Sequence, residues 1–399
     1  MKPSLIAFFT LAAIGVQAQT LTLPEAVAQA RSSRASVQAA RLKLEQARFA
    51  RRALGAAPTT SLLVGYTNDL RVGGSDEDLV LSQPVDLFGR TSALRRTGDA
   101  LVLQAEANLR QTELDLQSDV VTLYVEGVAA TSRLAIARDA EEAAARLLEA
   151  VKGLVEGGKL PGVQATRVSI ELDRAHATRR HREAELAAAR RRLLAAIGDG
   201  GEVTADAFPD LPVAEVSDGE LISWRADLLT LSSEISAAEA DARVARTSRL
   251  PQLELQGRRS PWQESDPTYG ARIQLTFPLL DYGKSRAEEG AASKRAEAAR
   301  KALADAQRIA LGEIDAAKLE VAGAVEQVKS LEMVVATSRD LVSRTQTGLR
   351  EGANTLIDVL DAARALREIE ESLVEARVTL ATAQSRYLRA TGSLIEVKQ

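Results

Sequence analysis

The sequence LVLSQPVDLFGR occupies residues 79–90, and a related sequence, IQLTFPLLDYGK, occupies residues 273–284. In both, a proline is followed after three residues by an aromatic residue, a glycine and a basic residue, Phe88–Arg90 in the first and Tyr282–Lys284 in the second. In the second stretch the residues before the proline alternate between apolar and polar, which is typical of a strand, and the first stretch shows this pattern less cleanly. The recurrence of this stretch 194 residues later indicates that the chain consists of two copies of one unit.

Two further pairs of motifs support the repeat. Glu156–Gly157 matches Glu351–Gly352 at an offset of 195 residues, and Ala196–Gly198 matches Ala390–Gly392 at an offset of 194. A stretch rich in Gly, Pro and Asp separates the two copies, as expected of a linker. The predicted organisation is a signal peptide over 1–18, a first repeat over 19–198, a linker over 199–218, a second repeat over 219–392 and a C-terminal tail over 393–399.

The N-terminus has the features of an export signal. Lys2 supplies a positive charge, Leu5–Val16 is an apolar run, and Val16–Ala18 is a small-x-small cleavage site. A membrane anchor is the alternative, but a spanning helix needs about 20 apolar residues, more than this run offers. No later stretch looks long and apolar enough for a membrane helix. We therefore expect an exported protein without a helical membrane span.

Each copy is expected to contain a helix, two strands, one very long helix, a glycine turn and a last helix. The first copy has an expected helix over 23–54, strands over 59–67 and 78–86, a helix over 88–154 and a helix ending at 197. The second has an expected helix over 219–248, strands over 251–258 and 269–278, and helices over 282–350 and 355–390. At about 1.5 Å per residue the long helices reach on the order of 100 Å, so they must pack lengthwise against other helices. Apolar residues recur in the second long helix at the seven-residue period of a coiled coil: Val321, Val328, Val335, Val342 and Leu349.

The strands of the second copy alternate between one apolar and one polar face. The apolar positions, which we expect to face lipid, are Leu253, Leu255, Tyr269, Ile273, Leu275 and Phe277. About nine residues suffice for a tilted membrane strand. Hairpins lying on a soluble core are the alternative. Because open strand edges are not tolerated in hydrocarbon, the four strands of one chain would have to be pooled, and three chains would supply the even number of twelve.

The composition excludes several classes of function. The chain has no cysteine and two histidines, which excludes a thiol nucleophile, a disulfide frame, a cysteine zinc site and a lipid-modified cysteine. His176 and His181 lie about 140° apart around a helix and do not face one metal. A net charge of −4 and only 3% aromatic residues argue against nucleic-acid binding. No catalytic set is visible, so we expect no enzyme, no cofactor and no metal site.

Residues 351–362 read EGANTLIDVLDA, a glycine turn followed by an Asp-Val-x-x-Ala helix start. With the junction at 83–90 and the order of elements over 20–392, this segment resembles the TolC-like outer-membrane efflux protein family. The resemblance implies a mainly helical fold with a small β part. It implies a homotrimer in which four membrane strands per chain complete a twelve-stranded β-barrel and long antiparallel helices form an α-barrel.

The same resemblance implies a function, a location and partners. It implies a passive exit duct of a tripartite efflux or secretion system, which exports small molecules or ions across the periplasm and the outer membrane. The location would be the outer membrane of a Gram-negative bacterium, with an extension into the periplasm. The implied partners are outer-membrane lipid, a periplasmic adaptor and an inner-membrane pump.

The resemblance also implies site residues. Asp358 and Asp361 match acidic positions that line the narrow periplasmic entrance, where three copies would form a ring of six carboxylates that attracts cations and raises their pKa by mutual repulsion. Helix N-terminal acids are the alternative. The periplasmic tip, where an adaptor would dock, would comprise Gly157, Pro161, Gly352, Thr355, Leu356 and Val359. The glycines are also ordinary helix C-caps, and packing within the hairpin is the alternative for the apolar residues.

The chain departs from the family pattern at the tip. Some members join neighbouring subunits by an Arg–Asp pair, and the matching positions here are Asn354 and Val163, so this charge link is absent. A periplasmic adaptor and a structural coiled-coil protein remain the alternative functions. The substrate stays open between metal ions and drugs or other small molecules. Ser82–Pro84 and the compact length resemble the cobalt–zinc–cadmium branch of the family.

Overall fold

The computed structural model describes residues 19–69, 74–198, 203–204, 207–211, 225–260 and 268–395. The predicted signal peptide and most of the predicted linker and tail lie outside the described residues. The chain divides into two compact units. Unit 1 comprises Met1–Arg34, Leu114–Ala214 and Ile314–Gln399, and unit 2 comprises Ala35–Glu113 and Glu215–Glu313. Each unit therefore combines segments from both halves of the sequence.

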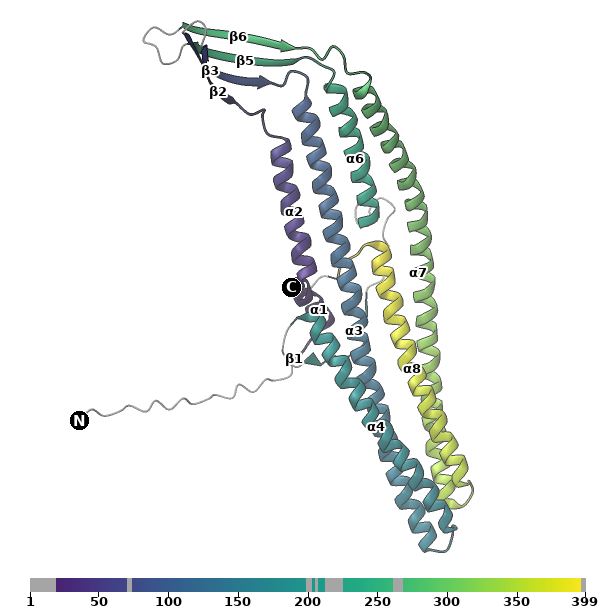
Figure 1. Cartoon of the computed structure of the whole chain (residues 1–399). Helices are drawn as coiled ribbons and strands as arrows, with labels where there is room; N and C mark the ends of the chain where they lie inside the picture. Colours follow the sequence, from purple (N-terminus) through teal and green to yellow (C-terminus); the bar gives the residue numbers. More distant parts are fainter. Residues whose placement is uncertain are drawn as a thin grey trace, which may run out of the picture. The chain divides into compact units, whose positions relative to one another are not determined.

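Unit 1 is built around two helical hairpins (Figure 1). The first joins α3 (Arg90–Glu156) to α4 (Gly162–Ile197), and the second joins α7 (Lys284–Glu351) to α8 (Leu356–Thr391). The parts of α3 and α7 before Leu114 and Ile314 belong to unit 2. Both long helices are uninterrupted, as predicted from the absence of internal proline.

The predicted heptad of α7 faces the interior. Val321, Val335 and Leu349 are buried, and Val328 and Val342 are half-buried. At the end of the hairpins, a buried cluster draws residues from all four helices: Val151, Val168, Leu349, Leu356 and Val359. Because these residues lie next to the two glycine turns in sequence, both turns lie at the same end of unit 1, as predicted.

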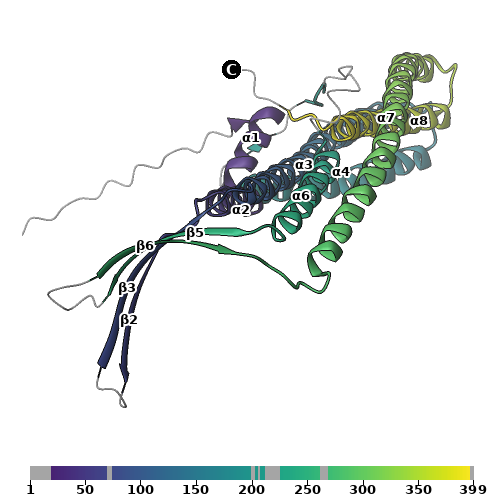
Figure 2. The same cartoon turned by 90° about the horizontal axis from the view of Figure 1, so that it is seen from above.

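Unit 2 contains an antiparallel sheet of four strands in the order β2-β3-β5-β6. The strands are β2 (Ser61–Asp69), β3 (Gly74–Val85), β5 (Gln252–Ser260) and β6 (Thr268–Thr276). Figures 1 and 2 show them side by side, with α2 (Ala35–Leu54) leading into β2 and α6 (Ala226–Thr247) leading into β5. The pairing of β3 with β5 joins the two hairpins that the sequence predicted separately into one sheet.

The predicted helix over 23–54 is wrong in one respect, because it is two helices. α1 (Leu23–Ser33) ends before Arg34, whose backbone is extended at φ −69° and ψ 123°. The hydroxyls of Ser32 and Ser33 donate to the carbonyls of Gln29 and Ala30 at 2.8 and 3.4 Å. Such side-chain bonds to the backbone compete with the helix ladder and favour a helix end.

The polar stretch 67–78, predicted to be a turn, largely continues the strands. Thr67 pairs with Asp76, and Asp69 pairs with Gly74. Strand pairing uses backbone groups, so it extends into polar sequence that hydrophobic alternation does not mark. Two short strands were also missed: β4 (Val203–Thr204), in the predicted linker, pairs in parallel with β1 (Gln19–Thr20), at the start of the first repeat. α6 begins at Ala226, and residues 219–224 of the helix predicted over 219–248 lie outside the described residues.

One helix does pass a membrane-span test by length and composition, contrary to the expectation above. A window of 18 residues within α3 has a mean hydropathy of 1.3. However, 56% of that window is buried inside the protein. Val120, Val121, Val125 and Val128 are each at most 2% exposed. The apolar character of this segment is that of a helix in the core of unit 1.

Candidate functional site

The first turn of α8 carries a reciprocal cap between Thr355 and Asp358. The backbone amide of Thr355 donates to Asp358 Oδ2 at 2.8 Å, and the Thr355 hydroxyl donates to the same oxygen at 2.7 Å. In return, the amide of Asp358 donates to Thr355 Oγ1 at 3.3 Å. This is a capping box in which Asp takes the usual place of Glu. The spacing Thr-x-x-Asp is visible in the sequence, but neither the predicted entrance position nor the alternative of a helix N-terminal acid included this cap.

The cap determines the protonation of Asp358 within one chain. The hydrogen bonds from the hydroxyl and then the amide of Thr355 lower the pKa of this carboxyl below its ordinary value. The predicted rise in pKa concerns three copies around an axis, a different environment from that of a single chain. Asp358 is exposed, so its carboxylate is charged at neutral pH and open to the solvent.

Asp361 lies one turn farther along the same face of α8. Its side chain is 65% exposed, and Oδ1 lies 3.7 Å from Arg364 Nη1. Arg364 also reaches Glu171 Oε1 of α4 at 3.6 Å. The structure thus brings Asp358 and Asp361 together as two exposed carboxylates at the turn end of unit 1, each with one local partner.

The two glycine turns differ in detail. Gly352 ends α7 with φ at 81°, in the left-handed region predicted for a C-cap glycine. In the first turn the left-handed residue is Gly158, at φ 71°, and not the predicted Gly157. The amide of Gly157 still donates to the carbonyl of Gly153 at 3.0 Å and so prolongs the helix ladder. Pro161 has an extended backbone immediately before α4 and fixes the start of that helix.

Two of the predicted tip residues are not available for docking. Leu356 is 3% exposed and Val359 is not exposed, because both pack in the buried cluster with Val151 and Leu349. Leu356 and Val359 therefore pack within the helical hairpins, which was the alternative to a docking role. The exposed apolar residues at this end are Val163 and Ile357. Sequence analysis did not single out Ile357, since helical periodicity places this residue on a face only after the start of α8 is known.

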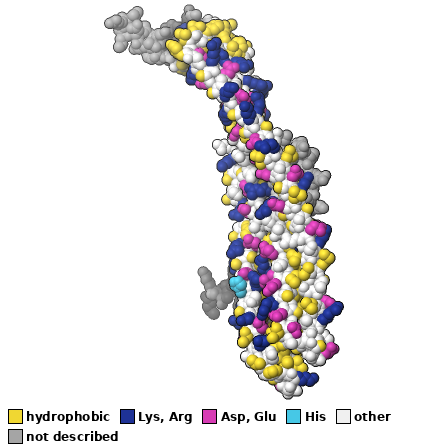
Figure 3. Space-filling model, turned by 90° about the vertical axis from the view of Figure 1, so that its right-hand side faces the viewer, with side chains coloured by type: hydrophobic (Ala, Val, Ile, Leu, Met, Phe, Trp, Pro, Cys, Tyr) yellow, Lys and Arg dark blue, Asp and Glu magenta, His cyan; other side chains and the backbone are white. Residues whose placement is uncertain are grey.

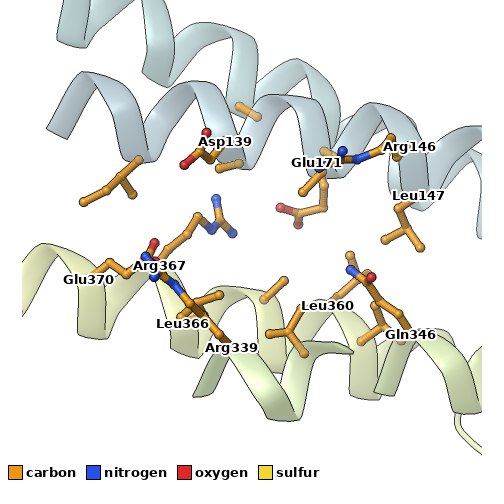
Figure 4. Close-up of a pocket in the computed structure, with 18 residues that line it drawn as sticks. Asp139, Arg146, Leu147, Glu171, Arg339, Gln346, Leu360, Leu366, Arg367 and Glu370 are labelled. Carbon is orange, nitrogen blue, oxygen red and sulfur yellow. Dashed lines mark hydrogen bonds and ion pairs between the residues drawn. The ribbon is translucent and has the colours of Figure 1, made fainter. Parts of the chain in front are cut away.

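A cavity of about 540 Å³ lies between the two hairpins of unit 1. Figure 4 shows Asp139, Arg146 and Glu171 of the first hairpin opposite Arg339, Arg367 and Glu370 of the second. Arg339 Nε donates to Glu370 Oε1 at 3.0 Å. Charged side chains line this cavity, and no group of three or more His, Asp or Glu residues able to hold a metal occurs in the described part of the chain.

The sheet of unit 2 exposes its apolar face. Leu253 pairs with Leu275, and Leu255 pairs with Ile273, so these four predicted residues lie on one face. Tyr269 also lies on this face, opposite Arg259, whose guanidinium is 5.6 Å from the centre of the Tyr269 ring. Ile273 and Tyr269 are 71% and 72% exposed. Among the residues that the structure describes, little therefore covers the side chains of Ile273 and Tyr269.

The other strand residues also divide between an apolar and a polar face, with some exceptions. Phe277 is exposed but lies one residue beyond the end of β6. Register places Leu62, Val64 and Leu81 on the apolar face, and all three are exposed. The opposite face is polar in β5 and β6, where Gln256 Nε2 donates to Gln274 Oε1 at 3.3 Å. Leu63, which is exposed, and its pairing partner Val80 interrupt this pattern in β2 and β3, because both are apolar residues on the polar face.

An antiparallel sheet with one bare apolar face, in a chain that also carries long paired helices, is the organisation of an outer-membrane channel subunit. The chain belongs to the outer membrane efflux protein family, whose model matches residues 26–199 and 219–393. This family consists of passive channels and is not a class of enzymes. The mainly helical fold with a small sheet, the outer-membrane location with a periplasmic extension, and the role as an exit duct for efflux or secretion are thereby confirmed.

Individual relatives show the breadth of the family. The pyoverdine export outer membrane protein OpmQ of Pseudomonas aeruginosa is 24% identical over 79% of this chain and 69% of its own length. The cobalt-zinc-cadmium resistance protein CzcC of Cupriavidus metallidurans is also 24% identical, over 87% of this chain and 84% of its own. Among solved structures, CusC has a TM-score of 0.77 at 19% identity, covering 93% of this chain and 92% of that one. The outer-membrane channel OprN has a TM-score of 0.75 at 23% identity, covering 93% and 90%.

Proposed function

We propose that three copies of this chain form one outer-membrane exit duct. The observation that carries the proposal is the bare apolar face of a sheet whose two edge strands, β2 and β6, each have one edge without a strand partner in the described part of the chain. In hydrocarbon every backbone donor and acceptor needs a partner. Pairing β6 of one copy with β2 of the next satisfies both edges, and three copies give a closed barrel of twelve strands.

The polar face of the sheet then lines the channel, and the apolar face contacts lipid. The two halves, 19–198 and 219–392, act as structural repeats, since each contributes one hairpin to the barrel and one helical hairpin to the periplasmic part. The exported cargo is a small molecule or an ion selected by the inner-membrane pump. The names of the relatives include both pyoverdine export and cobalt-zinc-cadmium resistance, so the family relation is compatible with either class.

The entrance lies at the turn end of unit 1. Asp358 and Asp361 are exposed there on one helix face, and threefold symmetry would gather six carboxylates around the axis. A narrow opening lined by carboxylates favours cations. The exposed tip residues Gly157, Pro161, Gly352 and Thr355, with Val163 and Ile357, form the surface that a periplasmic adaptor would contact.

Cross-linking of edge strands tests the assembly, and a chain without native cysteine suits it. Ser61→Cys with Thr276→Cys places thiols at the same end of β2 and β6, at the outer edges of the sheet. Oxidation in outer membranes should give covalent dimers and trimers on denaturing gels. The matched control is Ser82→Cys with Gln256→Cys, which pair in register within one chain and should give only an internal link. Monomers alone from the edge pair, under conditions where the control pair links fully, would contradict the barrel.

A further inference from the structure

A second cavity, of about 470 Å³, lies in unit 2 where the strands meet the helices. Its walls come from the connection between α2 and β2, the end of β3, the first turn of α3 and the start of β5. Most of the lining side chains are small or apolar: Ala53, Ala57, Pro58, Val85, Leu94 and Leu253. Nothing in the described part of unit 2 fills this space. A cavity with such walls suits a hydrocarbon chain better than a polar solute.

The cavity is continuous with the apolar face of the sheet. Val85 and Leu253 pair in register at the end of β3 and β5 next to the helices, and both line the cavity. Leu255 and Leu81 continue the same face away from the helices. Leu87, which also lines the cavity, is exposed. Apolar surface therefore extends along β5 from Leu255 to Leu253 at the cavity, whereas on β3 the polar Gln83 lies between Leu81 and Val85.

Basic side chains of α2 and α3 lie near one side of this apolar region, where Arg51 is paired with Asp99. Arg90, the first residue of α3, lines the cavity and is exposed. Arg95 Nη2 donates to the carbonyl of Gly55 at 3.2 Å, which holds its guanidinium beside the α2–β2 connection. Arg51 and Arg52 occupy the last turn of α2. On the face drawn in Figure 3, Lys and Arg side chains (dark blue) lie next to the hydrophobic side chains (yellow) at the sheet end.

The carboxylate of Asp86, which lines the cavity, already has hydrogen-bond partners. Asp86 accepts hydrogen bonds from the backbone amides of Arg90 and Thr91 at 2.9 and 2.7 Å, so its carboxylate caps the start of α3. With Asp86 engaged in this way, a second anion at the rim would meet the exposed guanidinium of Arg90. An apolar cavity bordered by a guanidinium matches a molecule with an acyl chain and a phosphate.

We propose that this cavity binds one acyl chain of a phospholipid from the inner leaflet of the outer membrane, with the phosphate held at Arg90. The inference rests on the proposed function, in which the sheet spans the membrane. The helices leave the sheet on the periplasmic side, so the cavity lies at the level of the inner leaflet. This lipid would be held without a covalent bond and would fix the junction between strands and helices at the membrane surface.

Native mass spectrometry of the full-length protein provides the test. The protein is released from nanodiscs of phosphatidylglycerol or phosphatidylethanolamine, and the retained lipids are counted. Wild type should retain one phospholipid per chain. Ala57→Phe fills the cavity and should lower retention of both lipids by about tenfold, because each methylene that leaves an apolar site weakens binding several-fold. Arg90→Gln should weaken retention of phosphatidylglycerol more than that of phosphatidylethanolamine.

Two control variants have matched chemistry away from the cavity. Ala287→Phe and Arg286→Gln are exposed substitutions in the first turns of α7 and should leave retention unchanged. A trimer that holds no phospholipid, or that loses lipid equally in Ala57→Phe and Ala287→Phe, would overturn the lipid site while leaving the channel assignment intact. A monomer that needs no detergent would instead refute the proposed function.

Discussion

Asn354 folds back onto Gly348, one turn before the end of α7. The amides of Ala353 and Asn354 both donate to the carbonyl of Gly348, at 2.7 and 3.1 Å. The side-chain amide of Asn354 lies where a Cβ of residue 348 would point, and such a Cβ would be 2.8 Å from Asn354 Cγ. Asn354 stands at the position where some family members are expected to have an arginine that links subunits. Here this side chain closes its own turn.

The contact between Gly348 and Asn354 leads to a stability prediction. Gly348→Ala should lower the free energy of unfolding by about 1–3 kcal/mol, because the added methyl forces the turn apart. The thermal unfolding midpoint, followed by circular dichroism in detergent, measures this loss. Gly323→Ala is the control, since a Cβ there meets nothing within 4 Å. In a helix interior this control should stabilise by about 0.5–1 kcal/mol. Equal effects at both positions would contradict the role of Asn354.

The lipid-facing assignment is tested by an adjacent pair on β6. Ile273→Arg should impair assembly in the membrane by roughly 2–4 kcal/mol at mid-depth, because it places a charge on the apolar face. Gln274→Arg should be tolerated, since Gln274 points to the polar face with Gln256. The fraction of protein recovered as trimer from outer membranes reports the difference. Similar recovery for the two variants would argue for a sheet that does not contact lipid.

The entrance carboxylates should give the channel a preference for cations. Asp358→Asn combined with Asp361→Asn should reduce both this preference and block by divalent cations, because the field of the ring is strongest where the channel is narrow. In wild type the block should weaken as the pH falls and the ring becomes protonated. Single-channel conductance in planar bilayers measures each effect. Unchanged selectivity and block in the double variant would place the charge ring elsewhere.

The cap between Thr355 and Asp358 should keep the start of α8 closed. Thr355→Ala should destabilise this turn by about 1 kcal/mol, whereas Thr355→Ser, which keeps the hydroxyl, should preserve it. Hydrogen exchange at the amide of Asp358 measures local opening. Exchange as slow in Thr355→Ala as in Thr355→Ser would show that the cap does not hold the turn.

The same cap has a pH dependence with a defined sign. Hydrogen bonds from Thr355 lower the pKa of Asp358 in the folded chain. The stabilisation is therefore complete above the pKa of an unfolded aspartate, about 3.9, and is lost as the pH falls through the lower folded value. After correction for the intrinsic rate, exchange at this turn should be constant near neutral pH and should rise only in acid. Thr355→Ala should lack this acid-dependent increase.

Much of the fold could be predicted because the signals are local and long. The absence of proline and the heptad of Val321 to Leu349 predicted one continuous helix, which the structure contains as α7. Alternation predicted that Leu255 and Ile273 share a face, and register places them opposite each other. Both patterns follow from the periodicity of a single helix or strand, which the sequence of an element displays when one of its faces is apolar.

The tertiary structure decided which of the predicted residues are accessible and which partners they have. Leu356 and Thr355 are adjacent in the tip motif, yet one is buried against Val151 and the other is exposed. The pairing of β3 with β5 and the apolar cavity beside Val85 also depend on segments far apart in the chain. Periodicity fixes the direction of a side chain relative to its own element, whereas burial and pairing depend on which other element packs there. That choice is made by contacts over more than a hundred residues of sequence, and a local pattern does not contain it.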